Sequence, residues 1–368
     1  MELYIDRNAL GRTLAGIQGI VERRSTTPVL SHTLIHARPQ GLRMTATDTE
    51  VAFIGELPAN VEAPGEIAVD ANNLFQVVRN LSDPTVHLKV GSGSRLEVRC
   101  GPSHYRLPGI PAEDYPPLPA FDAKGSATMK SSDLRRLVDQ VVFSVATDDA
   151  RYGLNGAHLE DQGDGRVRMV ATDGHRLSAA DAPYEGTLAM TPRMLVPRKA
   201  LGVLRKLLDG PEEDLEVGFG DGAIRLVRPG QTLWFRLLDG EFPDYKAVLP
   251  QECKHRVRID RNRLGASLKR VGILVQERSR AVRFAFEDGE GTIQVHNVDR
   301  GEVTEKLPVE LEGDAITVGF NVRYLQEILS VIDADHVELE LSHALGPCLV
   351  KGQGDEDAFF VVMPMRLD

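Results

Sequence analysis

The chain has 368 residues, of which 42% are hydrophobic and 26% are charged, and its formal net charge at pH 7 is −11. This composition is typical of a folded chain of roughly two to four domains and excludes a disordered, collagen-like or disulfide-rich protein. The negative charge argues against a protein that binds nucleic acid simply by being basic. The longest uncharged apolar runs are short, so we expect no membrane span, and no secretory signal pattern is visible, which predicts a cytoplasmic protein.

Apolar residues at helical spacing predict six helices along the chain. In the first of them Leu10, Leu14 and Ile17 form one apolar face. An Asp near the start of three of these helices predicts an N-cap, because its carboxylate accepts hydrogen bonds from unpaired backbone N–H groups. The predicted helices cover residues 6–24, 70–81, 130–140, 197–208, 260–271 and 320–333.

Short runs with period-two alternation lie between the helices and predict antiparallel strands covered on one face. The segment from Gly91 to Ser94 is followed by such a run, so it predicts a hairpin turn and not a phosphate-binding loop. The clearest runs are residues 96–99, 215–219, 223–227 and 337–341.

The pattern repeats along the chain. Residues 44–48 (Met-Thr-Ala-Thr-Asp) and 169–173 (Met-Val-Ala-Thr-Asp) are nearly identical, and residues 295–299 form a weaker third copy. A unit of about 125 residues is large enough to have its own core. Proline clusters mark the joins, so we predict an α+β fold of three tandem similar domains, each with two helices packed on antiparallel sheets, at residues 1–122, 123–252 and 253–368.

Positive charge concentrates in the predicted helices. Together they sum to +9, so the rest of the chain carries −20. Lys and Arg are good helix formers, and solvated helix surfaces explain part of this pattern. The alternative is a weakly basic face that attracts a polyanion without gripping it. The basic residues that charge counting offers as contacts for such a polyanion are Arg79, Arg135, Arg136, Arg198, Lys199, Arg205 and Lys206.

Five stretches resemble a known family over the full length of the chain. They are residues 171–177 (Ala-Thr-Asp-Gly-His-Arg-Leu), 196–199 (Val-Pro-Arg-Lys), 239–245 (Asp-Gly-Glu-Phe-Pro-Asp-Tyr), 319–322 (Gly-Phe-Asn-Val) and 361–367 (Val-Val-Met-Pro-Met-Arg-Leu). In their order and spacing they resemble the bacterial DNA polymerase III beta subunit, the beta sliding clamp.

This resemblance implies a DNA clamp without a catalytic site. Two copies would assemble head-to-tail into a six-domain homodimeric ring around double-stranded DNA and act as a processivity factor in DNA replication. The implied partners are the replicative DNA polymerase, the clamp loader, and other DNA polymerases and repair proteins that bind through short peptide motifs.

The resemblance also implies site residues. For DNA it singles out Arg24 and Tyr152. The chain departs from a well-known relative at Asn72, Asp148, Gly153 and Ala247. For partner peptides the resemblance implies a pocket of apolar and hairpin residues: Leu154, Thr172, Gly174, His175, Arg176, Leu177, Pro243, Val248, Val361, Met363, Pro364, Met365 and Arg366.

Two other functions compete for the same residues. Asp173 and His175 resemble an acid–base pair of a hydrolase, but the Asp recurs at 48 and 299 while the His does not, which favours a turn-forming role for the Asp. A protein-only scaffold is the other alternative. The scattered His residues predict no metal site, and no cofactor is expected. The three cysteines, Cys100, Cys253 and Cys348, are expected to be small core residues.

Overall fold

The computed structural model describes the whole chain except residues 22–26, 92, 149–152, 192–193, 276–280 and 368. The backbone divides into two compact units, which are described separately. Unit 1 comprises Met1–Arg135, Tyr184–Thr191 and Lys199–Leu237, and unit 2 comprises Arg136–Pro183, Pro192–Arg198 and Leu238–Asp368. Among the described residues, no helix combines the length and the apolar character needed to cross a bilayer.

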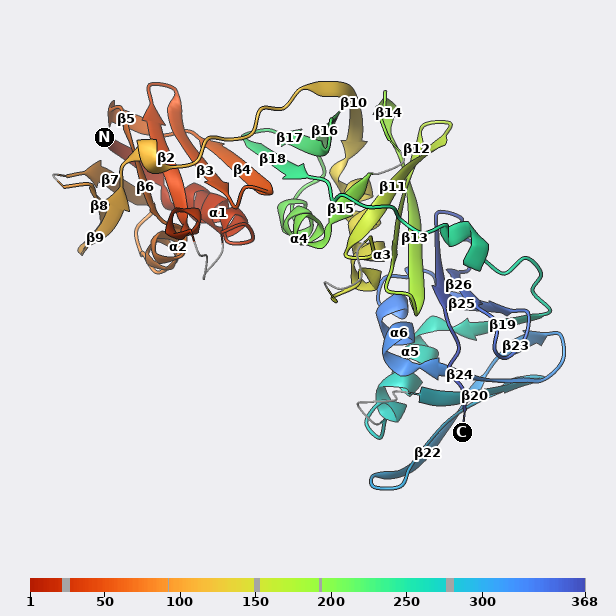
Figure 1. The fold of residues 1–368 in the computed structure, drawn as a ribbon. Coiled ribbons are helices and arrows are strands. Elements are labelled where there is room, and N and C mark those ends of the chain that lie inside the picture. The colour runs from red at the N-terminus through yellow and green to blue at the C-terminus, as the bar shows by residue number, and fades with distance from the viewer. Residues whose placement is uncertain (22–26, 92, 149–152, 192–193, 276–280, 368) are drawn as a thin grey trace. The chain divides into compact units, whose positions relative to one another are not determined.

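Unit 1 contains one continuous sheet of 14 strands in its described part, and all neighbouring strands are antiparallel (Figure 1). Its strands are, in spatial order, β14 (Glu185–Gly186), β10 (Ala123–Lys130), β16 (Asp214–Gly220), β17 (Ala223–Arg228), β18 (Gln231–Arg236), β4 (Val51–Leu57), β3 (Gly41–Thr47), β2 (His32–Arg38), β6 (Gly65–Asp70), β9 (Ser103–Ile110), β8 (Arg95–Cys100), β7 (Thr85–Val90), β1 (Glu2–Asp6) and β5 (Asn60–Ala63).

Unit 2 contains two antiparallel sheets in its described part. The larger has the order β15 (Leu195–Pro197), β11 (Gly156–Gly163), β12 (Arg166–Thr172), β13 (Arg176–Pro183), β27 (Ala358–Val362), β26 (Cys348–Gly352), β25 (His336–Leu341), β19 (His255–Asp260) and β23 (Glu310–Glu312). The smaller has the order β22 (Gly301–Pro308), β21 (Glu290–Asn297), β20 (Ala281–Glu287) and β24 (Ile316–Asn321).

Six α-helices are present in the described residues, at the six predicted places. They are α1 (Arg7–Ile17), α2 (Ala71–Arg79), α3 (Ser131–Val141), α4 (Arg198–Leu207), α5 (Arg261–Val271) and α6 (Val322–Leu329). Four short 3₁₀ turns accompany them: η1 (Pro28–Ser31), η2 (Ala112–Asp114), η3 (Val142–Ser144) and η4 (Tyr245–Val248). The predicted strands at 96–99, 215–219, 223–227 and 337–341 are β8, β16, β17 and β25.

The N-caps follow the prediction at two of its three places. Asp6 and Asp260 accept backbone N–H bonds from Ala9 and Arg263, each at 2.8 Å. Asp133, however, is wrong as a cap, because α3 begins at Ser131 and the carboxylate lies inside the first turn. There it still interacts favourably with the positive end of the helix dipole.

The first helix is shorter than predicted. It ends at Ile17, although the predicted span runs to residue 24. The apolar periodicity misleads here, because Ile20 is fully buried without being helical. Its backbone N–H donates to the Ile17 carbonyl at 2.9 Å in a tight turn that follows Gly16 and contains Gly19. Glycine weakens helix continuation at this point.

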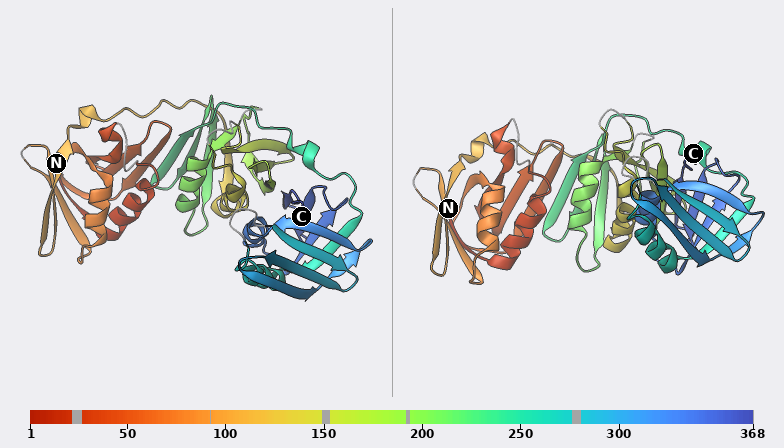
Figure 2. Two further views of the ribbon diagram at one scale, coloured as in Figure 1. Left: turned by 60° about the horizontal axis from the view of Figure 1, so that its bottom comes forward. Right: turned by 90° about the horizontal axis from the view of Figure 1, so that it is seen from below.

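In each unit, two helices pack together against a sheet. In unit 1, α1 and α2 lie side by side on one face of the 14-stranded sheet, against β2, β4 and β6, as both views of Figure 2 show in red and orange. Leu10 and Leu14 of α1 and Leu74 of α2 are fully buried there. In unit 2, α5 and α6 pack in the same manner.

One cysteine departs from the expectation. Cys100 and Cys348 are buried, as expected of core residues, whereas Cys253 is exposed. It follows Pro250 in the segment that leads into β19, outside the regular strands, so no sheet face covers it.

Candidate functional site

A tight hairpin joins β12 to β13 at the centre of the candidate partner-binding residues. Asp173 organises it: its Oδ1 accepts the backbone N–H groups of His175 at 2.9 Å and Arg176 at 3.1 Å. The Thr172 hydroxyl donates to the Arg176 carbonyl at 2.6 Å and accepts the Gly174 N–H at 3.1 Å. Gly174 has φ +86°, a left-handed conformation that favours glycine.

The same turn recurs at β3–β4. There Asp48 Oδ1 accepts the N–H groups of Glu50 at 2.9 Å and Val51 at 2.6 Å. In the third copy, Asp299 is the wrong equivalent, since Asn297 Oδ1 accepts the N–H groups two and three residues ahead, at 3.0 and 3.1 Å. Asp48 and Asp173 are therefore turn formers. Because Oδ1 of Asp173 already accepts two backbone hydrogen bonds, this arrangement argues against an acid–base role for Asp173.

The C-terminal strand joins the hairpin. Strand β27 pairs with β13, with Leu177 opposite Val361, and the Met363 N–H donates to the His175 carbonyl at 2.9 Å. Beyond Pro364, which has no N–H, the Met365 N–H bonds the Gly319 carbonyl of β24 at 2.8 Å. The tail therefore crosses from one sheet of unit 2 to the other.

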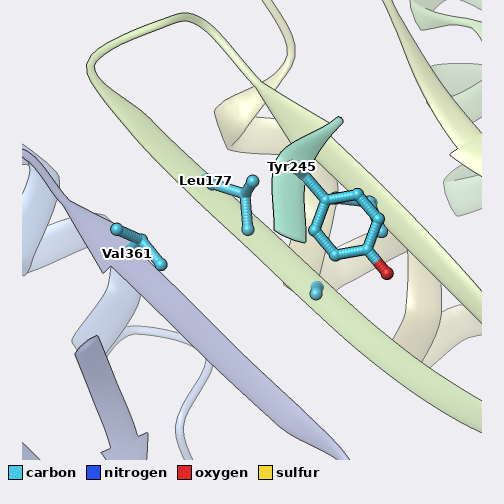
Figure 3. Close-up of a cluster of buried hydrophobic side chains, with 5 residues drawn as sticks. Leu177, Tyr245 and Val361 are labelled. Atoms are coloured by element: carbon cyan, nitrogen blue, oxygen red, sulfur yellow. The ribbon is translucent and has the colours of Figure 1, made fainter. Parts of the chain in front are cut away.

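An apolar cluster lies over these two strands. It consists of Val170, Leu177, Ala179, Tyr245 and Val361, which are all buried. Figure 3 shows Leu177 and Val361 on neighbouring strands with the Tyr245 ring above β13. Phe242, Leu249, Leu349 and Phe359 pack against the cluster and are only partly buried.

Large apolar side chains are exposed nearby in sequence. Val248, at the end of η4, is 42% exposed, and Met363, just after β27, is 38% exposed. A partly covered apolar surface of this kind gains free energy when a partner's apolar side chains cover it.

Polar contacts hold Tyr245 beneath this surface. Its hydroxyl donates to Glu160 and accepts from Arg168 Nη1 at 3.4 Å. Burial and the hydrogen bond to the Glu160 carboxylate raise the pKa of Tyr245 to about 12. Arg168 is itself fixed by Asp181 at 2.6 and 2.7 Å, and this pair raises the pKa of its guanidinium.

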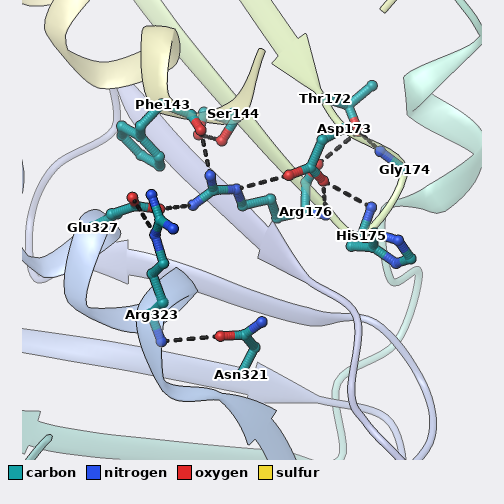
Figure 4. Close-up of polar contacts among 11 residues, drawn as sticks. Phe143, Ser144, Thr172, Asp173, Gly174, His175, Arg176, Asn321, Arg323 and Glu327 are labelled. Carbon is teal, nitrogen blue, oxygen red and sulfur yellow. Dashed lines mark hydrogen bonds and ion pairs between the residues drawn. The ribbon is translucent and has the colours of Figure 1, made fainter. Parts of the chain in front are cut away.

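Arg176 ties the hairpin to α6 (Figure 4). Its side chain is only 8% exposed, and its Nε donates to Asp173 Oδ2 at 3.1 Å. Its two terminal nitrogens donate to Glu327 and to the Phe143 carbonyl. The guanidinium carbon lies 4.5 Å from the centre of the Tyr324 ring and 5.2 Å from that of Phe143. Arg176 is therefore a structural anchor, and its charge is largely hidden from a partner.

The structure brings the hairpin residues (172, 174–177) together with Val361 and Met363 through the β13–β27 pairing and the bond from Met363 to His175. The tail beyond them (364–366) is joined at Met365 to Gly319 of β24. Leu154 is half-buried before β11, and Pro243 and Val248 are exposed on either side of Tyr245. Sequence reasoning missed Val170, Ala179 and Tyr245. The recurrence of Asp-Tyr at 114–115 and 244–245, next to each predicted join, is the signal that points to the tyrosine.

The candidate DNA-binding residues differ in their surroundings. Arg79, Arg198, Arg205 and Lys206 are exposed on α2 and α4. Three others form ion pairs within the chain: Arg135 with Asp209 at 3.0 Å, Arg136 with Asp355 at 3.0 Å and Asp357 at 3.2 Å, and Lys199 with Asp48. Arg24 and Tyr152 lie outside the described residues.

The repeated unit of two helices against antiparallel strands, together with the strand-paired C-terminal tail, defines a DNA-clamp protein. The chain belongs to the DNA polymerase III beta subunit family. Models of the family's N-terminal, central and C-terminal domains match residues 1–119, 128–244 and 246–366. The family consists of sliding clamps, which are non-catalytic processivity factors of DNA replication.

Relatives and solved structures agree with this assignment. The chain is 38% identical over 371 residues to the beta sliding clamp of Pseudomonas aeruginosa, with all of both chains covered. The sliding clamp of Bartonella birtlesii, bound to griselimycin, is 31% identical with a TM-score of 0.94. The beta sliding clamp of C. crescentus, with PEG bound, is 33% identical with a TM-score of 0.92. Each of these two matches covers 100% of this chain and 100% of the solved chain.

Proposed function

We propose that this chain works as a sliding clamp in the cytoplasm through a partner pocket on unit 2 and a basic set of helices. Two copies close head-to-tail into a ring around duplex DNA, with domains at residues 1–122, 123–252 and 253–368. The ring tethers the replicative polymerase and receives the clamp loader and repair proteins in turn. Retention then depends on encirclement, so no single phosphate contact has to be tight.

The observation that carries the proposal is the partly covered apolar cluster at the β13–β27 pair. Its floor is rigid, because Arg176 and Tyr245 are each held by several polar contacts. Its rim is adaptable, since Met363 and Met365 follow the last strand and methionine side chains fit varied apolar surfaces. A rigid floor with an adaptable rim suits short peptide segments from several different partners.

The pocket is tested by removing the rim. Met363→Ala and Val248→Ala should together weaken binding of a polymerase-derived peptide by about tenfold, because each truncation removes exposed apolar area that the peptide would cover. The matched control is Leu345→Ala, since Leu345 is also apolar and is 61% exposed in the same unit. Equal weakening in the control, or unchanged binding in the double variant, would place the peptide elsewhere.

The DNA contact is proposed for the exposed cations Arg79, Arg198, Arg205 and Lys206, with a smaller share for the half-buried Arg135, Arg136 and Lys199. Replacing all four by Gln should reduce the salt dependence of binding to linear duplex by a slope of roughly 0.9 for each phosphate that the variant no longer neutralises. Arg136→Gln, whose cation is held by two carboxylates, should change that slope little.

Encirclement is tested by topology. The protein is loaded on closed circular DNA with a clamp loader, and the DNA is then cut once. Retention on the circle and release after cutting support the ring. Equal retention on both forms would contradict it and would favour a protein that binds DNA laterally or not topologically.

A further inference from the structure

The partner-pocket architecture occurs a second time, in unit 1. Strand β18 pairs with β4, with Trp234 opposite Ala52, just as β27 pairs with β13 with Val361 opposite Leu177. The Arg236 N–H donates to the Glu50 carbonyl at 2.8 Å, which reproduces the bond from Met363 to the hairpin. With the shared Asp turn described above, the two strand pairs are equivalent in both register and end geometry.

A tyrosine is buried beside each strand pair. Tyr115 of unit 1 follows η2, and its hydroxyl accepts the Thr47 N–H at 3.1 Å, so it is anchored next to the β3–β4 hairpin. Beyond Tyr115 the chain continues through Leu118 and Pro119 to Phe121, as it continues beyond Tyr245 through Val248. Both segments thus place apolar residues after an anchored tyrosine.

A cavity of about 360 Å³ lies at this place in unit 1. Ala52, Ile54, Phe121 and Trp234 contribute to its apolar walls. Its volume falls within the range of natural ligand sites, at the lower end.

Two lining residues of the cavity carry an unsatisfied donor. Nε of Arg225 and Nε1 of Trp234 are buried and have no hydrogen-bond partner among the described residues. Such a donor is costly to leave unpaired, because it has given up its hydrogen bonds to water. The guanidinium carbon of Arg225 lies 4.8 Å from the centre of the Phe121 ring, which holds the group over the cavity wall.

The charge of the cavity has one sign. Arg43 and Arg225 line it, and no carboxylate is among its described lining residues. Two cations beside apolar walls are complementary to a carboxylate flanked by bulky apolar side chains. In the second unit the equivalent position is occupied by the purely apolar Leu349 in place of Arg225, so the two pockets differ in chemistry.

We propose that the cavity between β4, β18 and the segment of Leu118 to Phe121 is a second peptide-binding site, selective for a short acidic segment with leucine or phenylalanine next to its carboxylate. The occupant is a segment of a partner protein. The site goes beyond the pocket at β13–β27 and does not depend on it.

The test uses a built-in reporter, because Trp234 is the single tryptophan of the chain. The probe is the peptide acetyl-Asp-Leu-Leu-Phe-amide, titrated into the full-length protein while tryptophan emission is recorded. We expect a saturable change in emission, and binding at least about tenfold weaker for the peptide with Lys in place of Asp, because a cation cannot accept the charge-assisted hydrogen bonds.

Variants separate the site from its surroundings. Arg225→Met, which keeps an apolar stem and removes the donor, and Arg43→Met should each weaken binding by about tenfold. Arg236→Met is the matched control, since Arg236 is an exposed arginine on the same strand as the reporter Trp234, outside the cavity lining. Met363→Ala should leave the tryptophan signal unchanged.

The inference is overturned if emission shows no saturable change up to millimolar peptide, if the Lys peptide binds as well, or if both arginine variants bind normally. It is also overturned if Met363→Ala abolishes the signal, because the response would then come from the other pocket. Failure of the Met363 and Val248 variants in the polymerase-peptide assay bears only on the β13–β27 pocket, so the two outcomes are distinguishable.

Discussion

Arg176 shows how one side chain connects the hairpin of the site to a helix far away in sequence. Its partners, Asp173 and Glu327, are themselves only 20% and 28% exposed. Removing a buried cation from such partners leaves carboxylates without compensation in a medium of low polarity. The residue therefore affects stability more than partner recognition.

We expect Arg176→Met to destabilise unit 2 by about 3 kcal/mol, because the partly buried Asp173 loses its cation and Glu327 keeps only the exposed Arg323. Hydrogen exchange of the amides in β13 and α6 measures this locally. Arg323→Met is the control, since Arg323 pairs with the same Glu327 at 3.0 Å but is 57% exposed, and it should cost about 0.5 kcal/mol or less. Similar destabilisation in both variants would contradict the anchoring role.

The buried Tyr115 is expected to lower the free energy of unfolding of unit 1 at high pH. Burial raises its pKa to about 12, from an ordinary value of 10.0. Folding favours the neutral form of Tyr115, so the stability that this residue contributes is fully present below about pH 10. It is lost between pH 10 and 12, at about 1.4 kcal/mol per pH unit, as the unfolded chain ionises first. Denaturant unfolding of unit 1, followed by Trp234 emission, measures the slope.

Tyr115→Phe should reduce this pH dependence, whereas Tyr105→Phe, at a position 39% exposed, should not. A slope that is unchanged in Tyr115→Phe would mean that another group governs alkaline unfolding. Tyr245, whose pKa is also raised to about 12, predicts a parallel decrease of stability in unit 2.

At the scale of elements, the C-terminal tail and β24 depend on a glycine. A Cβ added to Gly319 would lie 2.5 Å from the Met365 carbonyl oxygen and 2.8 Å from Leu367 Cδ2. The backbone of the tail cannot remain there with any side chain at 319. The tail and the rim of the partner pocket are thus positioned by the absence of a side chain on a neighbouring strand.

Gly319→Ala should displace the tail, expose the Met365 amide to exchange, and weaken partner-peptide binding by about tenfold, because the rim is no longer ordered before the peptide binds. Gly265→Ala is the matched control, because nothing lies within 4 Å of an added Cβ there. A Met365 amide that stays protected in Gly319→Ala would show that the tail is held by other contacts.

Local patterns predicted the helices well and the pairing between distant strands not at all. The starts of α1 and α5 follow from Asp6 and Asp260, whose effect is confined to one turn. The β4–β18 and β13–β27 pairings join segments far apart in sequence, and alternation along a strand does not specify its neighbour. For the same reason the site residues could be taken from a family resemblance, but the contacts of Tyr245 and the unpaired donors of Arg225 and Trp234 required the structure.

At the scale of the whole molecule, closure of the ring requires two different sheet edges to meet. Strand β22 is an edge of the four-stranded sheet in the described residues. Strand β9 pairs with β8 along its length but with β6 only at Gly109 and Ile110, so its first residues leave one side open in the described part of unit 1. Unpaired edges of this kind invite strand pairing between copies.

These edges carry opposite charges. Arg106 of β9 is 62% exposed and Glu302 of β22 is 82% exposed. We expect Arg106→Glu to raise the dimer dissociation constant by about tenfold, and combination with Glu302→Arg to recover part of it, as measured by sedimentation. Dimers unchanged by Arg106→Glu would exclude β9 from the junction.

The position of β27 also bears on biosynthesis. This strand is synthesised after every other described strand of its sheet, yet it lies in the interior of that sheet, between β13 and β26. Unit 1 closes with β18, more than a hundred residues earlier, and can mature while translation continues. The larger sheet of unit 2 must wait for β27, with the edges of β13 and β26 unpaired until then, and this interval is when the nascent protein most needs protection from aggregation.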